Sequence, residues 1–167
     1  MIWVKSALFT GTVITVRYIF SLINSDGDQK IDKMKEMIDF TEYLRVYSCD
    51  MKMSFEEIYQ KYSFKSSETK KLVKLMHEFL KEKRSSQELL VYINKFMLTP
   101  DPFNMYFAEI IDYYGSAYSD LLNKKLNLAL EEMKKSLDEY AARHNEIKAL
   151  NNRISFLAGC LAAIIIV

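Results

Sequence analysis

The sequence predicts an all-α fold, in which a helical bundle lies between two terminal membrane helices. Three observations predict it. Four Gly and two Pro in 167 residues are too few for the frequent turns of a β-sandwich or barrel. Half of the residues are apolar, which predicts a packed core rather than disorder. All 22 acidic and 20 of the 23 basic residues lie between Asn24 and Asn152, so both ends are almost uncharged. We therefore expect an N-terminal transmembrane segment over residues 1–24, a bundle domain over 25–152 and a C-terminal transmembrane segment over 153–167.

The N-terminal segment from Ile2 to Ile23 contains no acidic residue, and its only charges are Lys5 and Arg17. A bilayer core needs about 20 apolar residues of helix, a length reached here only if Arg17 is included. An arginine near the end of such a helix can extend its guanidinium to the interface. The alternatives are a secretory signal peptide, an interfacial helix and a soluble core helix. No Ala-x-Ala cleavage site follows Ile23.

The first half of the middle segment contains a turn signal and a capping signal. Asp26-Gly27-Asp28 predicts a turn, and it lacks the remaining ligands of a calcium loop. A long helix should follow, and Ser54-Phe55-Glu56-Glu57 is a capping box that should open a short helix. The buried stripe of the long helix is expected at Ile31, Met34, Ile38, Tyr43 and Tyr47.

Three further helices are expected before the last one. The first begins at Ser66-Ser67, the second at the capping box Ser85–Glu88, and the third after the break at Thr99–Pro102, ending at Gly115. Their apolar positions are Leu72, Leu75, Met76, Phe79 and Leu80, then Leu89, Leu90, Ile93, Phe96 and Met97, then Phe103, Tyr106, Phe107, Ile110, Ile111 and Tyr114.

The last helix should run from Ser119 without a break to Gly159 and continue into the C-terminal apolar segment. A coiled-coil-like seam recurs along it at steps of four and three residues. The residues of this seam are Leu130, Met133, Leu137, Tyr140, His144 and Ile147. His144 is a polar residue on this seam. It either fixes the register or the choice of partner of the paired helices, or it occupies a partly exposed position at a loosely packed end of the seam.

The C-terminal segment from Ile154 to Val167 is uncharged. As a helix it would rise about 21 Å, less than the bilayer core of about 30 Å, and a terminal core helix or strand is the alternative. Gly11 and Gly159 suggest a contact between the two end segments. Basic residues follow the first segment and precede the second, which predicts a cytoplasmic middle domain with both termini outside.

The residues offer little chemistry. Only two histidines occur, no pair of His or Cys has metal-ligand spacing, and the four Gly are scattered. We therefore expect a protein that is not an enzyme and has no cofactor or metal. The net charge of +1 also argues against nucleic acid as a partner.

One charged stretch stands out, from Lys65 to Arg84, with seven basic and three acidic residues. Within it Lys70, Lys74 and Lys81 share one helix face, which we call the basic face. This face predicts a surface for a protein partner or for lipid headgroups, and an ordinary solvated face is the alternative.

The layout resembles the stage III sporulation protein AB family of endospore-forming bacteria. The matching runs are 40–47 and 53–58 in the early helices, Leu128-Ala129-Leu130-Glu131-Glu132 in the last helix, and 157–164 in the Gly-containing aliphatic end. The proline that opens the family's second run is replaced here by Ser54-Phe55.

Members of this family are similar to the inner-membrane platform subunits of type II secretion and type IV pilus machines. The resemblance implies a non-enzymatic scaffold in the mother-cell membrane facing the forespore. It also implies a secretion-like channel complex, with a secretion-type ATPase and other membrane subunits as partners. A different class remains open, a tail-anchored helical adaptor that binds partner helices in an apolar groove.

Overall fold

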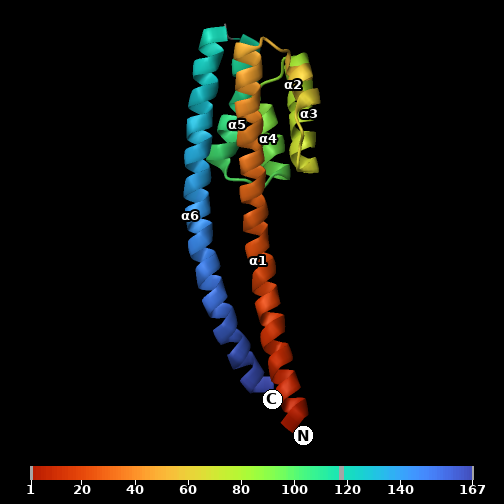
Figure 1. Cartoon of the computed structure of the whole chain (residues 1–167), viewed down its shortest axis with the longest axis vertical. Helices are drawn as coiled ribbons and strands as arrows, with labels where there is room; N and C mark the ends of the chain where they lie inside the picture. The colour runs from red at the N-terminus through yellow and green to blue at the C-terminus, as the bar shows by residue number, and fades with distance from the viewer. Residues whose placement is uncertain (1, 117–118, 167) are drawn as a thin grey trace. The chain divides into compact units, whose positions relative to one another are not determined.

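The protein is all-α in the computed structural model, which describes residues 2–116 and 119–166 (Figure 1). No strand occurs among these residues. The elements are α1 (Ile2–Arg45), a π-helical turn (Val46–Asp50), α2 (Phe55–Lys61), α3 (Ser67–Glu82), α4 (Ser86–Phe96), α5 (Asp101–Ser116) and α6 (Ser119–Ile166). The chain forms two compact units. One, here called the hairpin, combines residues 2–29 with 141–166, and the other, the helical domain, comprises residues 30–140.

The predicted turn at Asp26-Gly27-Asp28 is wrong, because α1 continues through these residues to Arg45. Glycine inside a helix costs about 1 kcal/mol relative to alanine, which weakens a helix without ending it. Gly27 is buried, and the imidazole of His144 from α6 occupies the space where a Cβ would be. The glycine therefore serves packing between two helices, not chain reversal.

The helical domain is built around one apolar core. Phe40 of α1 is fully buried and meets the rings of Phe55 and Tyr62 edge-on, with centroids 6.0 and 5.3 Å away. α4 packs against α5, and α3 packs against α2, α4 and α5. Side chains of every helix in the domain contribute to the core, including Met34, Leu44, Ile58, Val73, Met76, Phe79, Leu89, Ile93, Phe103, Phe107, Leu126 and Met133.

Serine caps set the starts of α2, α3 and α4. The capping box at Ser54 is confirmed, with bonds in both directions between Ser54 and Glu57. Ser66 accepts hydrogen bonds from the first backbone amides of α3, and Ser85 accepts one from Glu88 N. The side chain of Glu88 instead binds Arg84 at 2.7 Å. Each cap contributes about 1 kcal/mol to helix stability.

One charged side chain is buried in the domain for a structural reason. Glu36 of α1 is only 3% exposed. Its carboxylate accepts hydrogen bonds from the backbone amides of Lys65 and Ser66, the latter at 3.1 Å. These are the amides at the start of α3, so Glu36 joins α1 to the α2–α3 connection. A buried carboxylate is tolerated here because it is hydrogen bonded.

The start of α5 also depends on buried polar groups. Asn104 is fully buried and donates to Asn94 Oδ1 at 2.8 Å and to the Thr99 carbonyl at 2.9 Å. The helix begins at Asp101, and it ends at Ser116, one residue beyond the predicted stop. The continuous last helix is confirmed, since α6 runs from Ser119 to Ile166.

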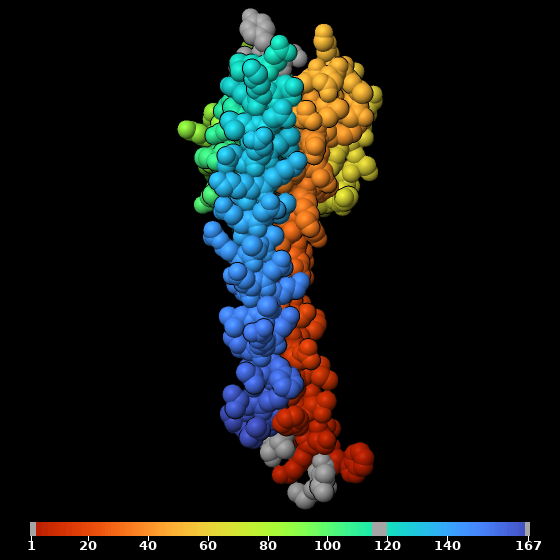
Figure 2. Space-filling model, turned by 60° about the vertical axis from the view of Figure 1, so that its left-hand side comes forward, coloured from red at the N-terminus to blue at the C-terminus, as the bar shows by residue number. Residues whose placement is uncertain are grey.

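The hairpin consists of two antiparallel helical segments, α1 up to Gln29 and α6 from Ala141. The N- and C-terminal ends of the chain lie close together at one end of this pair (Figure 1). Side chains of the two segments are in contact along the pair (Figure 2). The compact units divide at residues 29 and 140, so the hairpin includes a few polar turns of each helix beyond the apolar ends.

Candidate interaction sites

The basic face lies exposed on α3, but two of its three lysines have carboxylate partners. Lys74 Nζ lies 4.0 Å from Glu78, and Lys81 Nζ lies 3.6 Å from Glu56 of α2. Lys70 is exposed near the start of the helix. Because exposed ion pairs contribute little to stability, these contacts mainly reduce the bare positive charge of the face.

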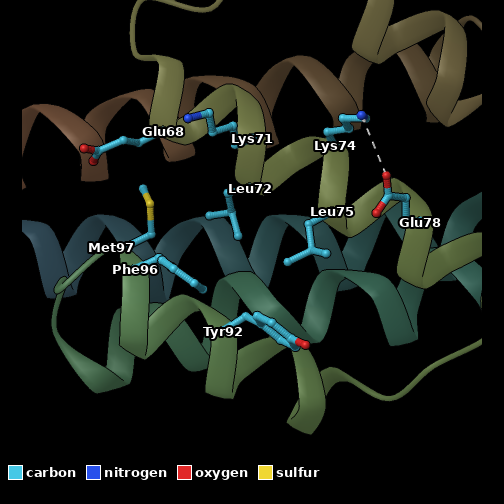
Figure 3. A pocket seen from close by; sticks show the side chains of 9 residues that line it. All are labelled: Glu68, Lys71, Leu72, Lys74, Leu75, Glu78, Tyr92, Phe96 and Met97. Atoms are coloured by element: carbon cyan, nitrogen blue, oxygen red, sulfur yellow. Dashed lines mark ion pairs between the residues drawn. The ribbon is translucent and has the colours of Figure 1, made fainter.

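A groove next to the basic face separates α3 from α4 (Figure 3). It has a volume of about 560 Å³. Leu72 and Leu75 point into it from α3. Tyr92, Phe96 and Met97 line the opposite wall.

The groove contains one residue that was expected to be buried and one that the sequence analysis did not single out. Phe96 was expected on the buried stripe of α4, but it is 62% exposed. Lys71 was not assigned to the basic face, yet it lines the rim of the groove. The sequence feature that could have indicated the groove is Lys71 next to Leu72, together with the aromatic residues Tyr92 and Phe96 one turn apart in the next helix.

In the hairpin, a charged cluster joins α1 to α6. Lys148 Nζ donates to both oxygens of Asp28, at 2.9 and 2.7 Å, and His144 Nε2 lies 3.0 Å from Oδ1. These contacts with the Lys148 ammonium and His144 imidazole lower the pKa of the Asp28 carboxyl below its ordinary value. His144 is only 8% exposed, so its ring is part of the interface between the two helices.

Gly27 makes room for that ring. A Cβ at this position would lie 2.2 Å from His144 Cε1 and 2.3 Å from Nδ1. Ordinary contacts between such atoms are about 3.5–4.0 Å, so only glycine fits here without displacing the imidazole. His144 is thus packed within the interface rather than at a loosely packed end, and its role in setting register stays a prediction.

Beyond this cluster the interface continues with amides and small side chains. Asn24 is 5% exposed, accepts from Asn151 Nδ2 at 2.9 Å and donates to Asn152 Oδ1 at 3.4 Å. Ser155, Gly159 and Ala163 follow at steps of four along α6, and all three are buried. A Cβ on Gly159 would lie 3.2 Å from the Cα of Val13.

Only part of the suggested glycine contact is present. Gly159 packs closely against α1 at Val13, but nothing in the described structure lies within 4 Å of a Cβ at Gly11. Gly11 lies on the exposed side of α1 and does not contribute to the contact with α6.

The seam residues separate into two groups in the structure. Leu130 and Met133 are buried in the domain, and Leu137 and Tyr140 pack partly buried against the same core. His144 is buried in the hairpin, whereas Ile147 is 54% exposed and lies outside the interface, contrary to expectation. A straight α-helix has 3.6 residues per turn, so a seventh-residue repeat drifts around it and Lys148 takes the facing position.

The outer surface of the hairpin is strongly apolar. Large apolar side chains that are at least 42% exposed occur on both segments, namely Trp3, Val4, Leu8, Ile14, Tyr18, Ile19, Leu22, Ile23, Ile147, Leu150, Ile154, Phe156, Leu157, Leu161, Ile164 and Ile165. Among the described residues one helix, from Trp3 onward, is long and apolar enough to cross a membrane. None of its most apolar stretch is buried within the molecule.

The groups capable of chemistry are dispersed. No cluster of three or more His, Cys, Asp or Glu side chains that could hold a metal ion occurs in residues 2–116 and 119–166. His77 stacks on the ring of Phe55, with centroids 5.6 Å apart, and its Nε2 lies 3.8 Å from Glu56. Cys49 is half-buried beside Ser48, with 3.7 Å between the sulfur and the hydroxyl.

Comparison with known proteins identifies no relative of the chain. No protein-family model, no curated protein and no solved structure matches the chain.

Proposed function

We propose that the protein is a membrane-anchored scaffold without catalytic activity, held in the bilayer by its hairpin. The distribution of polarity in the hairpin carries this proposal. Amide, glycine and serine groups lie between the two helices, while leucine, isoleucine and aromatic side chains point outward. A water-soluble helix pair would bury its large apolar side chains instead. Lipid tails satisfy the outer side chains, and small or polar groups at the interface promote helix association in a membrane.

Two alternatives for the N-terminal segment fit less well. A soluble core helix would be buried, but the apolar stretch of α1 is not. A cleaved signal peptide would be separate from the mature fold, but α1 continues unbroken to Arg45. From Ile2 to Ile23 the helix rises about 33 Å, enough for the bilayer core of about 30 Å.

The two arginines near the apolar ends support a single membrane boundary. The contact of Val13 with Gly159 sets the antiparallel register of the hairpin. Arg17 follows Val13 by four residues and Arg153 precedes Gly159 by six, so the two lie within about one helical turn of the same level. Both side chains are exposed and can reach headgroups on the side of the basic residues. The positive-inside bias favours an orientation with the helical domain in the cytoplasm and both termini outside.

The C-terminal segment is part of the same anchor in this proposal. Its outward side chains include Leu157, Leu161 and Ile164, each more than 60% exposed. Its facing side carries the small residues that pack on α1. The close approach of Gly159 to Val13 supports the assignment, because small residues at an interface promote helix association in a membrane.

A more specific role is proposed from the sequence resemblance alone. The chain would be a platform subunit of a sporulation channel in the mother-cell membrane, working with a secretion-type ATPase and other membrane subunits. In an endospore-forming host that lacks the related subunit, the full chain should restore spore formation. A chain cut before Ile154 should not restore it, and the sporulation role would be rejected if the full chain gave no rescue although it reached the membrane.

A helix-binding adaptor is the second candidate function, and the open groove between α3 and α4 favours it. The two functions are compatible, because the groove belongs to the helical domain and the anchor to the hairpin.

Trp3 provides the test of membrane insertion. It is the only tryptophan in the chain, and its side chain is 89% exposed. In phosphatidylcholine vesicles we expect its emission to shift to the blue and to be quenched by brominated acyl chains. A Trp3→Phe, Met51→Trp variant serves as control, since Met51 is an exposed residue of the helical domain. Trp3 emission that iodide quenches as in water, and brominated lipid leaves unchanged, would reject the anchor.

A further inference from the structure

The α3–α4 groove has the form of a docking site for a helix. Its walls are two helices, and each contributes apolar side chains one helical turn apart, Leu72 and Leu75 from α3 and Tyr92 and Phe96 from α4 (Figure 3). A third helix can lay a stripe of side chains into such a groove. Met97, which is 2% exposed, completes the wall contributed by α4 and the residue after it.

The aromatic wall of the groove is packed on its inner side and exposed on its outer side. The Tyr92 ring packs edge-on against buried Phe79 at 5.9 Å and stacks on Phe96 at 6.3 Å. Phe96 is nevertheless 62% exposed and Tyr92 is 40% exposed. Such anchored aromatic side chains bind with little loss of conformational freedom, which is why they dominate protein interfaces.

The charges around the groove determine which helix it favours. Glu68 on the rim pairs with Lys33 of α1, and Glu78 lies 4.0 Å from Lys74. Lys71 lines the α3 wall, and neither Lys71 nor Lys95, the residue before Phe96 on α4, forms an ion pair with any described residue. The Lys95 ammonium lies 5.8 Å from the ring centroid of Phe96, which lines the groove. The two rim carboxylates are thus paired with lysines, which leaves, among the described residues, Lys71 on the α3 wall and Lys95 beside Phe96 as the unpaired charges near the groove.

We propose that this groove binds an amphipathic helix of another protein whose apolar stripe is flanked by Asp or Glu. Acidic side chains on each side of the stripe would meet Lys71 and Lys95 while the stripe covers Phe96 and Leu75. A second copy using its own α4 would bring Lys95 toward Lys71, which like-charge repulsion disfavours. The inference rests on the proposed role as an interaction scaffold and specifies the partner chemistry.

Two labelled model helices test the charge preference. Both carry Leu and Phe at every third or fourth position, and they differ only in whether Glu or Lys flanks this stripe. With the full chain in phosphatidylcholine nanodiscs, fluorescence anisotropy should show binding of the Glu helix at least tenfold tighter than the Lys helix. Empty nanodiscs measure partitioning of the peptides into lipid.

The variants separate the apolar and the charged contributions. Lys71→Glu with Lys95→Glu should reverse the preference, so that the Lys helix binds more tightly. The matched control is Lys124→Glu with Lys135→Glu on exposed α6 positions, which should leave the preference unchanged. Phe96→Ser should weaken both helices at least tenfold, whereas Leu128→Ser, at a similarly exposed site, should not. Circular dichroism checks that every variant keeps its helix content.

Several results would overturn the assignment. Binding that survives Phe96→Ser, or a preference that the charge reversal leaves intact, would place the peptide elsewhere. If phosphatidylglycerol nanodiscs abolish peptide binding at fixed salt, this surface lies on lipid headgroups. If the chain is a dimer that Phe96→Ser dissociates, the occupant is a second copy. If the full chain binds neither peptide while brominated lipid still quenches Trp3, only the groove assignment is rejected. If the Glu helix binds but brominated lipid does not quench Trp3, only the membrane anchor is rejected.

Discussion

Replacing Gly27 by alanine should destabilise the hairpin, although alanine is the better helix former. Helix propensity alone favours the substitution by about 1 kcal/mol. The new methyl group, however, would lie 2.2 Å from His144 Cε1, so the ring must retreat by more than an ångström. Overpacking of this kind costs about 1–3 kcal/mol, and the lost contact between His144 and Asp28 adds about 1 kcal/mol. We therefore expect a net loss of about 1–3 kcal/mol.

A double-mutant cycle isolates the contact. In a His144→Ala background the ring is absent, and Gly27→Ala should then stabilise α1 by about 1 kcal/mol. Gly11→Ala is the control in the wild-type chain, because nothing described lies within 4 Å of its Cβ. Local opening free energies come from hydrogen exchange of peptides covering residues 20–29 and 144–155, with the full chain in mild detergent. The reasoning fails if Gly27→Ala slows exchange as much with His144 present as without it.

Three further perturbations have directions set by named contacts. Glu36→Ala should lower the free energy of unfolding by about 1–3 kcal/mol, because the part-buried amides of Lys65 and Ser66 lose their acceptor. Exposed Glu42→Ala should cost under about 1 kcal/mol in the same thermal melts. The pKa of Asp28 is lowered below its ordinary value of 3.8, so its contact with Lys148 should stabilise the hairpin above that pH and lose this effect as the pH falls through the lowered pKa. Lys148→Met should raise the pKa of Asp28 in a carboxyl-carbon NMR titration. An unchanged pKa would show that Lys148 does not lower it. Asn24→Leu should speed hydrogen exchange in the hairpin by an amount equivalent to about 1–2 kcal/mol, whereas Asn127→Leu on α6 should leave the hairpin unchanged.

The local signals in the sequence predicted most helix starts because they act within one turn. Ser54, Ser66 and Ser85 cap the helices they were expected to cap. The turn at Asp26-Gly27-Asp28 failed because the deciding contact is tertiary. His144 lies more than one hundred residues away in sequence, and no local pattern shows that its ring will rest on Gly27.

The groove shows a second limit of periodicity. Leu89, Ile93, Phe96 and Met97 fall on one side of α4, and all four were expected to be buried. Periodicity gives the direction of the buried face but not its width, which depends on how many neighbouring helices cover it. In the structure Leu89, Ile93 and Met97 fill that face, and Phe96 lies at its edge against the groove. An aromatic residue at the edge of an apolar stripe is therefore informative about partners rather than about the core.

The hairpin shows how a change of spacing along one helix accompanies a change of surroundings. From Leu126 to His144 the facing positions of α6 advance by four and three residues in turn, and apolar side chains occupy most of them. From Asn151 onward they advance by four, through Ser155 and Gly159 to Ala163, and the large apolar side chains have moved to the outside. In water such a pair would expose its apolar residues and hold its helices together mainly through amides and small groups, which gives little hydrophobic stabilisation. In a bilayer the same arrangement lets lipid contact the outer side chains, while the small residues Ser155, Gly159 and Ala163 let the two helices approach closely. The reversal of polarity along α6 is thus explained by a change of solvent along the helix.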